Sequence, residues 1–334
     1  DAYSTLQSDA IRLADEINVK HGNGAYKPVL LIVRHHEPQE VFELFRAADL
    51  CIVSSLHDGM NLVGEKGKGE SIWLGFFLYD VLQRFARLAE SRQDTAFANL
   101  CHQQAVKIQQ NIETHGWDGD WYRRAYFDDG TPLGSATNEE CQIDSIAQSW
   151  AVLSGAGRPD RARQAMASVN ERLIRREDRL VQLFDPPFNT SKVEPGYIKG
   201  YIPGVRENGG QYTHGAIWAA MAMAELGQSE QAWELCSMLN PILHSLDAAG
   251  TSRYKIEPYV IAADVYSMPP NTGRGGWSWY TGSAGWMYRL IVETLFGLHV
   301  EVDRLHLKPL LPKAWNSFKL HYRHHETFYH LVVA

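Results

Sequence analysis

Two glycine-rich loops in the second half of the chain carry side chains suited to holding an anion. One contains His214, in VRENGGQYTHGAIW, and the other contains Thr281 and Gly282, in TGRGGWSWYTGSAGWMYR. Each loop runs directly into an apolar helical pattern, where glycines allow close backbone approach and free N–H groups suit an anion. A phosphate would fit the hydroxyl of Thr281 and the amides of Gly282 and Ser283. The alternatives are a simple helix cap at Thr281 or Ser283 and a structural role for His214.

Other polar and aromatic side chains are of the types that bind sugars. They are Glu207 and Gln211, just before the apolar helix that follows the first loop, and Trp121, Tyr122 and Arg123 in WDGDWYRRAYFDDG. Carboxylate, amide, guanidinium and aromatic groups together are what a carbohydrate cleft presents. The chain also holds ten Trp, fifteen Tyr and twelve Phe, rings that stack on sugar faces as readily as they fill a core. The alternative is a solvated loop with internal ion pairs and ordinary core packing.

A third candidate, Asp58, lies where two sequence patterns meet. In SSLHDGMNLVGEKGKGES, residues 54–71, the part up to Val63 is typical of a buried strand that opens into a polar turn. After Gly64 the stretch becomes a charged glycine-rich loop that leads into the aromatic helix pattern IWLGFFLYDVLQRFA. Either pattern could position the carboxylate of Asp58.

The elements that must position these residues differ along the chain. Residues 1–57 alternate helix and strand patterns, including a predicted buried strand in KPVLLIV (27–33), which indicates an α/β piece. Two strands cannot close a core alone, so this piece needs a neighbour. From Gly69 the strand patterns stop until about residue 298, where period-two alternation returns and predicts a β-rich element.

Between these two points apolar helices alternate with amphipathic ones. The apolar helices are predicted at 71–87, 142–154, 213–226, 257–266 and 283–296, and the amphipathic ones at 94–114, 159–177 and 228–246. A helix that is apolar all round is buried, whereas an amphipathic one faces water on one side. The alternation predicts stacked helical hairpins closed into a ring or toroid. Gly155, Gly227 and Gly297 stand where helix C-terminal caps belong.

Composition restricts the function classes. The 334 residues have a formal net charge of −7, which disfavours a nucleic-acid partner. Four cysteines at scattered spacings fit reduced thiols, and together with the lack of a leader or a long apolar run they predict a soluble, cytoplasmic protein with no membrane span. Histidines 321, 324, 325 and 330 lack metal-ligand spacing, so no metal site is predicted.

Two families are recognisable in the sequence. Residues from about 64 to the end closely resemble glycoside hydrolase family 94, the inverting glycoside phosphorylases, and especially the phosphorylase-like domain of cyclic β-1,2-glucan synthases. The matching stretches are VGEKGKGESIWLGFFLYDVL, WDGDWYRRAYFDDGTPLGSATNEECQIDSIAQSWAVLSGAG, ENGGQYTHGAIWAAMAMAELG, YKIEPYVIAADVYS and GRGGWSWYTGSAGWMYR. Residues 1–63 resemble part of a trehalose-phosphate synthase of glycosyltransferase family 20, in YSTLQSDAIRLADEIN and VFELFRAADLCIVSSLHDGMNLV. The chain thus looks like a fusion within the shared tetrapeptide DGMN.

The resemblance implies a mainly α fold. It predicts a Rossmann-like α/β fragment at 1–63, a partial (α/α) toroid or barrel with the catalytic portion at 64–297, and the start of a C-terminal β element at 298–334. In the family, the early barrel helices and an N-terminal β-sandwich precede the acid; here the unrelated α/β piece replaces them. The exposed inner helices would then present apolar surface that favours association, so a homo-oligomer is expected.

The same resemblance implies inverting phosphorolysis of β-glucosides to α-glucose 1-phosphate. Asp58 matches the general acid, and His214, Thr281 and Gly282 match the residues that hold phosphate, while Glu207 and Gln211 match positions near the sugar subsites. One carboxylate suffices because phosphate is already an anionic nucleophile, provided that Asp58 stays protonated near neutral pH. The expected partners are a β-glucan oligosaccharide and phosphate or glucose 1-phosphate, with no cofactor.

Departures from both families leave alternatives open. Leu56 and His57 replace the Trp-Asn pair that normally introduces the phosphorylase acid. Lys66 stands where the transferase family has a ribose-binding glutamate, with Glu65 one position early. The alternatives are therefore a nucleotide-sugar glycosyltransferase of the trehalose-phosphate synthase type and a non-catalytic fusion fragment.

Overall fold

A computed structural model describes residues 2–23, 26–32, 68–301 and 304–333, and its contacts divide the chain into two units, Asp1–Asp58 and Gly59–Ala334. In the first unit, helix α1 (Ala2–His21) is followed by an irregular segment that Asn18 holds through two hydrogen bonds to the backbone of Val29. The remaining predicted elements of this unit, and with them the Rossmann-like arrangement, lie outside the described residues.

The strand predicted at 27–33 is wrong over its described residues, 27–32. No strand forms there, and the side chains of Leu30, Leu31 and Ile32 are exposed. An apolar run becomes a buried strand only where neighbouring strands accept its backbone hydrogen bonds, and here the segment contacts a helix turn instead.

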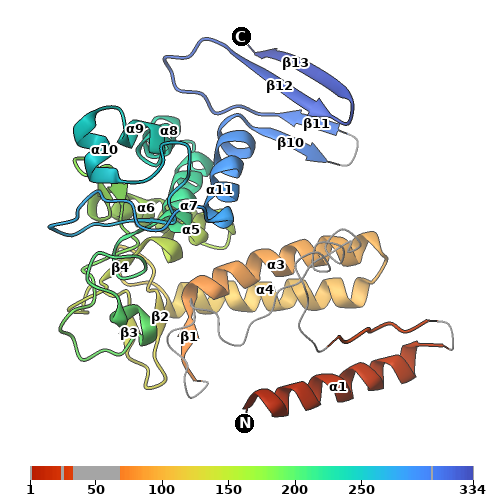
Figure 1. The fold of residues 1–334 in the computed structure, drawn as a ribbon. Coiled ribbons are helices and arrows are strands. Elements are labelled where there is room, and N and C mark those ends of the chain that lie inside the picture. The colour runs from red at the N-terminus through yellow and green to blue at the C-terminus, as the bar shows by residue number, and fades with distance from the viewer. Residues whose placement is uncertain (1, 24–25, 33–67, 302–303, 334) are drawn as a thin grey trace. The chain divides into compact units, whose positions relative to one another are not determined.

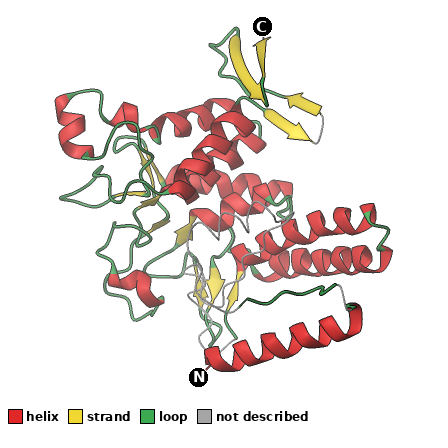
Figure 2. Cartoon of the chain, turned by 45° about the vertical axis from the view of Figure 1, so that its right-hand side comes forward, coloured by secondary structure: helices red, strands yellow, loops and turns green. Residues whose placement is uncertain are grey.

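The second unit is mainly α, as predicted, and consists of successive helical hairpins (Figures 1 and 2). Its α-helices are α3 (Ile72–Ser91), α4 (Thr95–His115), α5 (Ser145–Leu153), α6 (Pro159–Arg172), α7 (Thr213–Glu225), α8 (Ser229–Met238), α9 (Pro241–His244), α10 (Ala248–Tyr254) and α11 (Thr281–Tyr288). Helix α11 continues as the π-helical turn η2 (Arg289–Leu295), and η1 (Gly196–Gly200) is a short 3-10 helix.

The predicted alternation of inner and outer helices is present. Helices α3, α5, α7 and α11 contact one another in that order, while α4, α6 and α8 pack against α3, α5 and α7 respectively. In α5 the seven residues from Ser145 to Ala151 are all buried, and α7 is buried around nearly its whole circumference. The end helices of this row are more open: Phe77 and Leu78 of α3 and Tyr288 of α11 are exposed.

Tryptophan rings join the inner helices. Trp73 of α3, Trp150 of α5 and Trp218 of α7 lie in mutual contact, with ring centroids 5.6 to 6.2 Å apart. Trp218 also meets Trp286 of α11 edge to face at 5.4 Å. These rings fill the core where the inner helices cross, so core packing accounts for most of the aromatic side chains in this layer.

Short antiparallel strands occur in the loops between hairpins. They are β1 (Glu70–Ser71), β2 (Ala125–Tyr126), β3 (Pro132–Leu133), β4 (Ile143–Asp144), β5 (Ile174–Arg175), β6 (Leu180–Val181), β7 (Phe184–Asp185), β8 (Gln211–Tyr212) and β9 (Asp264–Val265). Strands β1, β2 and β3 form one sheet, and β4–β7, β5–β6 and β8–β9 are pairs. The expectation that strands are absent between 69 and 298 is therefore wrong, because two-residue ladders are too short to leave a period-two pattern.

Three predicted helices need correction. The helix predicted at 257–266 is wrong: this apolar segment is a loop that ends in β9. The helix predicted at 159–177 ends at Arg172, where the chain turns into the β5–β6 hairpin, and the one predicted at 228–246 breaks before Pro241, which begins α9. Proline lacks the N–H that would continue the preceding helix and suits a new first turn.

Two other features of the prediction are confirmed. Gly155, Gly227 and Gly297 follow helix ends with φ of 70°, 75° and 67°, the left-handed geometry that glycine tolerates. The C-terminal β element begins at residue 298. It comprises β10 (Leu298–Glu301) paired with β11 (Arg304–Leu307), and β12 (Phe318–His324) paired with β13 (Thr327–Val333).

Within the described ranges, no helix has the length and apolar character needed to cross a bilayer. Cys101, Cys141 and Cys236 are buried free thiols, and Cys51 lies outside the described residues.

Candidate functional site

Strand pairing brings the two glycine-rich loops together. Strand β8, at the end of the first loop, pairs with β9, and the amide of Thr213 donates to the carbonyl of Ala263 at 3.0 Å. The amide of Ala263 in turn donates to the carbonyl of Trp277, in the second loop, at 2.7 Å. The start of α7 and the loop that leads into α11 therefore belong to one hydrogen-bonded layer, although they lie more than fifty residues apart in sequence.

Helices α7 and α11 both begin without a side-chain cap. Their N-cap residues are Tyr212 and Tyr280, and neither makes a side-chain cap hydrogen bond. By contrast, Asp144 caps α5 through two backbone amides. Thr281 is the first residue of α11, and the hydroxyl of Ser283 donates to the carbonyl of Tyr280. The capping alternative for Thr281 and Ser283 therefore does not hold, and the helix start keeps the partial positive charge that attracts an anion.

His214 and Gly282 meet at these two helix starts. A Cβ placed on Gly282 would lie 2.5 Å from Nε2 of His214, so the ring edge faces the backbone of α11 directly. The imidazole stacks on Tyr212 with ring centroids 4.8 Å apart, and its Nδ1 is buried with no hydrogen-bond partner among the described residues. Burial lowers the pKa of His214, so the ring is neutral at pH 7.

Thr281 and Gly282 are exposed beside this half-buried imidazole. A hydroxyl, the amides at the start of α11 and a neutral imidazole thus gather on one side of the helix start. We call Thr281, Gly282 and His214 the anion cradle. The residues predicted to hold phosphate are brought together, and the uncapped amides carry partial positive charge; phosphate binding itself stays a prediction.

Three charged side chains, Arg206, Glu207 and Asp264, lie in the segments next to the cradle. The guanidinium of Arg206 lies 4.2 Å from the ring centroid of Trp277, and its Nε lies 3.3 Å from a carboxylate oxygen of Glu207. Asp264 is 1% exposed; its Oδ1 accepts the amide of Trp277 at 2.9 Å, and its Oδ2 has no hydrogen-bond partner in the described part of the chain. Burial raises the pKa of Asp264, and the Trp277 amide and the charge of Arg206 oppose that shift.

Glu207 and Gln211 occupy different environments. Glu207 is half-buried and pairs with Arg206 beside the second loop. Gln211 is 2% exposed, and its side-chain oxygen accepts the amide of Val181 at 3.0 Å. Its amide group therefore holds the β6 backbone, and a sugar contact remains a prediction for both residues.

Trp121, Tyr122 and Arg123 make contacts within their own region. The indole N–H of Trp121 donates to two backbone carbonyls at 3.0 Å, and the hydroxyl of Tyr122 donates to Glu113 at 2.6 Å. Arg123 pairs with Asp118 at 2.7 Å. Trp121 and Tyr122 are buried, the described contacts of these residues do not reach the cradle, and a sugar contact stays a prediction for them.

Asp58, the predicted general acid, lies outside the described residues. Lys68 and Gly69, the first residues described after it, donate their amides to Asp128. No group of three or more metal-ligating side chains gathers within the described ranges.

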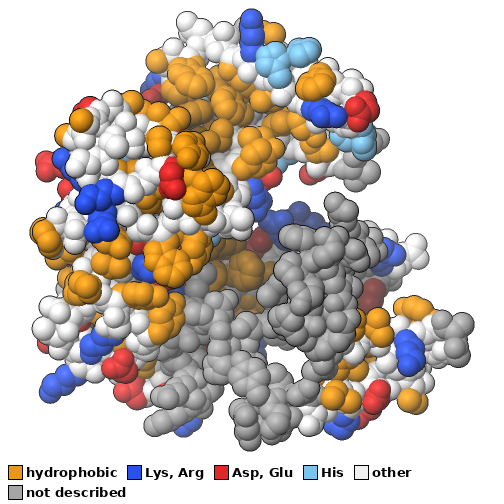
Figure 3. Space-filling model, viewed as in Figure 1, with side chains coloured by type: hydrophobic (Ala, Val, Ile, Leu, Met, Phe, Trp, Pro, Cys, Tyr) orange, Lys and Arg blue, Asp and Glu red, His pale blue; other side chains and the backbone are white. Residues whose placement is uncertain are grey.

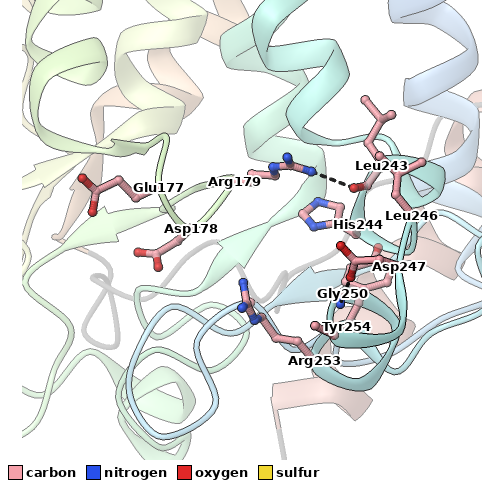
Figure 4. A pocket seen from close by; sticks show the side chains of 12 residues that line it. Glu177, Asp178, Arg179, Leu243, His244, Leu246, Asp247, Gly250, Arg253 and Tyr254 are labelled. Atoms are coloured by element: carbon pink, nitrogen blue, oxygen red, sulfur yellow. Dashed lines mark hydrogen bonds between the residues drawn. The ribbon is translucent and has the colours of Figure 1, made fainter.

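A separate cavity of about 300 Å³ opens beside α9 and α10 (Figure 4). Its lining comprises Glu177, Asp178, Arg179, Leu243, His244, Leu246, Asp247, Ala249, Gly250, Arg253, Tyr254 and Gly273. Arg179 donates to the carbonyl of Leu243 at 2.7 Å, and Asp247 caps α10. Because these charged groups hold the surrounding loops, the cradle remains the stronger candidate site.

Two residues of the site were not singled out from the sequence. Asp264 stands alone as a carboxylate inside the apolar run YVIAADVY, and that isolation was the available signal. Arg206 has a left-handed backbone, φ 51°, which the sequence does not reveal. Both were missed because their partners lie far away in the chain.

The family comparison matches residues 47–297 to the catalytic domain of the glycosyl hydrolase 94 superfamily. The chain belongs to this superfamily. Residues 1–66 match glycosyltransferase family 20, and the two matches overlap over 47–66, the segment that contains Asp58. The predicted resemblance to both families and the carbohydrate-active character are thereby confirmed, and the position of the junction within DGMN stays a prediction.

Curated relatives agree with this assignment. The chain is 49% identical over 278 residues to the cyclic beta-(1,2)-glucan synthase NdvB of Rhizobium meliloti (strain 1021), covering 83% of this chain and 10% of that protein. It is 34% identical over 273 residues to solabiose phosphorylase of Paenibacillus borealis, covering 80% of this chain and 35% of that protein. The chain thus spans a minor part of the relatives it matches.

A solved structure titled Sialidase superposes with a TM-score of 0.52 at 13% identity, covering 79% of this chain and 24% of that one. At this identity the likeness indicates a shared fold and carries no information about activity.

Proposed function

We propose that the helical unit belongs to an inverting glycoside phosphorylase that cleaves β-glucosides, of the β-1,2-glucan or cellobiose type, with inorganic phosphate. The observation that carries the proposal is the approach of His214 to Gly282 at two uncapped helix starts. Membership of the glycosyl hydrolase 94 superfamily and the phosphorylases among its relatives support it.

The cradle would hold phosphate as a nucleophile. The amides at the start of α11, the hydroxyl of Thr281 and the imidazole of His214 donate to its oxygens. One phosphate oxygen attacks the anomeric carbon as the glycosidic C–O bond breaks, and the leaving sugar oxygen takes a proton from Asp58. The products are α-glucose 1-phosphate and a shortened β-glucan. Phosphate is a co-substrate here, and no cofactor takes part.

The same proposal extends to the architecture. The inner row of α3, α5, α7 and α11 would be part of an (α/α) toroid whose remaining helices come from elsewhere. The exposed side chains of Phe77, Leu78 and Leu88 on α3 support this, because an inner helix of a closed ring is covered on both flanks. A second copy of the chain is the partner that we propose for this surface, in a cytoplasmic setting.

The proposal is tested by phosphate release from α-glucose 1-phosphate with a β-1,2-glucan or cello-oligosaccharide acceptor. Phosphate release is expected in the wild type and its loss in Asp58→Asn, since an asparagine cannot exchange the proton. His214→Ala is expected to raise the KM for phosphate in the reverse assay with little change in the KM for glucan. Equal rates in wild type and Asp58→Asn would refute the assignment, and no turnover in either would favour a non-catalytic fusion.

The family match of residues 1–66 favours a second candidate, a nucleotide-sugar site in the first unit. Calorimetric titration with UDP-glucose separates the two candidates. Heat of binding to the nucleotide sugar without phosphate-dependent turnover would favour a glycosyltransferase-type protein, whereas no heat would remove this candidate.

A further inference from the structure

Two exposed aromatic rings meet near the anion cradle, Trp279 from the loop that leads into α11 and Tyr259 from the loop that precedes β9. Hydrophobic side chains gather in several places on the surface of the protein (Figure 3), and Trp279 and Tyr259 are among the most exposed of them, at 68% and 75%. Their rings meet at 6.4 Å and 70°. Large rings at this exposure remain wet in the free protein, so they are available to a ligand.

The backbone of Trp279 is held in an unfavourable conformation. Its φ is 64°, in the left-handed region, where a bulky side chain costs about 1–2 kcal/mol relative to glycine. The loop is fixed on both sides: the backbone of Trp277 bonds to Ala263 and Asp264, and Tyr280 is the N-cap residue of α11. An exposed tryptophan maintained at a strained position indicates a use for the ring, since glycine would suit the backbone better.

A carboxylate fixes the orientation of this ring. The indole N–H of Trp279 lies 3.2 Å from Oε1 of Glu257. Hydrogen bonds from the backbone amide of Glu257 itself and from this indole lower the pKa of that carboxylate, which therefore stays ionised. An exposed aromatic face beside a carboxylate is the combination that binds a sugar: ring C–H groups stack on the indole and hydroxyls donate to the carboxylate. A protein partner would instead have to desolvate Glu257.

The position along the chain links this surface to the cradle. Trp279 precedes Thr281 by two residues, so their Cα atoms lie within about 7 Å of each other. The exposed indole is therefore carried on backbone adjacent to the cradle, within reach of a sugar chain whose reacting end is bound there.

We propose that Trp279, with Tyr259 and Glu257, is a stacking platform for the β-linked glucan chain next to the reacting bond. The platform rests on the proposed phosphorolysis for the identity of its ligand. Stacking rather than a set of directional hydrogen bonds would let the chain slide after each cleavage, because an aromatic face accepts successive rings equally.

The test is calorimetric titration of the full chain with linear β-1,2-linked glucan oligosaccharides and, separately, with cello-oligosaccharides. Trp279→Gly removes the ring and relieves the left-handed strain. It is expected to keep a Tm at or above that of the wild type while glucan binding weakens by about tenfold. Tyr288→Ala, which removes an exposed ring on α11, is the matched control and should leave glucan affinity unchanged.

The outcomes separate the platform from the proposed function. Unchanged glucan affinity in Trp279→Gly, or a wild type that binds neither oligosaccharide, would overturn the platform. Weakened binding together with wild-type phosphate affinity supports it, because that pattern places the loss on the sugar side. Loss of glucan affinity in the variant without phosphate-dependent turnover in the wild type would overturn phosphorolysis and leave the platform standing.

Discussion

Substituting Gly282 by alanine tests the anion cradle most directly. The added Cβ would lie 2.5 Å from Nε2 of His214, closer than carbon and nitrogen approach without a bond, so the imidazole must move. The ring is stacked on Tyr212, and turning it away from a preferred rotamer costs about 0.5–1.5 kcal/mol. Alanine gains at most about 1 kcal/mol over glycine here, because Gly282 is in the first turn of α11 and the full value applies to a helix interior. These two effects nearly cancel, and the free energy of unfolding should change by less than about 1 kcal/mol.

Phosphate binding should respond much more strongly than stability. Displacing the imidazole removes a hydrogen bond to a charged ligand, worth about 1.5–3 kcal/mol, which corresponds to an affinity loss of about 10- to 150-fold. The assay is calorimetric titration with inorganic phosphate, accompanied by thermal denaturation of the same samples. Gly285→Ala is the matched control: it lies in the same helix, and an added Cβ there has no neighbour within 4 Å. It should gain stability and bind phosphate as the wild type does.

A double-mutant cycle locates the effect. In a His214→Ala background the space beside Gly282 is free, so adding Gly282→Ala should cause no further loss of phosphate affinity. If Gly282→Ala binds phosphate like the wild type, or if its effect is equal in both backgrounds, the contact between these two residues does not form the site. The reasoning about the cradle would then be refuted.

Three further predictions concern stability. Gly297→Ala should lower the free energy of unfolding, measured by urea denaturation, by at least about 3 kcal/mol, because φ is 67° and the added Cβ meets a backbone carbonyl. Gly227→Ala is the control: φ is 75° but the space around an added Cβ is open, so the loss should be about 1–2 kcal/mol. Asp264→Asn should stabilise the protein more at pH 7 than at pH 4. Burial raises the pKa of this carboxyl in the folded state above the ordinary aspartate pKa of 3.8, so wild-type stability falls as the pH rises between these two pKa values. Urea denaturation at pH 4 and at pH 7 measures the difference. Tyr122→Phe should cost about 1–2 kcal/mol through the lost hydrogen bond to Glu113, without changing the KM for glucan; a higher KM at unchanged stability would instead support the sugar contact predicted from the sequence.

Elements with strong local patterns were predictable from the sequence. The amphipathic helix predicted at 94–114 is α4, Thr95–His115, because its charged face and its capping Asp94 are encoded within a few residues. The buried helix predicted at 213–226 is α7 for the same reason: a run without a polar face has to be enclosed.

Features that depend on distant partners were not predictable. The segment YVIAADVYS has the apolar content of a helix, but the pairing of Tyr212 with Asp264 and the bond from Asp264 to the amide of Trp277 fix it as a loop and short strand. The contact between His214 and Gly282 spans 68 residues, and family resemblance rather than local spacing indicated it. Asp58 was likewise assigned by resemblance, and its geometry lies outside the described residues.

The tryptophan row has a consequence for optical experiments. Trp73, Trp150, Trp218 and Trp286 follow one another at contact distance, so light absorbed by one indole can pass to the others before it is emitted. Trp286 belongs to α11, whose first turn forms part of the cradle. Quenching of the Trp286 fluorescence would therefore also lower the emission of the other three indoles, because they transfer their energy to it. The emission of these four indoles should therefore report together on the packing of the inner helices, whereas the exposed Trp277, Trp279 and Trp315 contribute a separate signal.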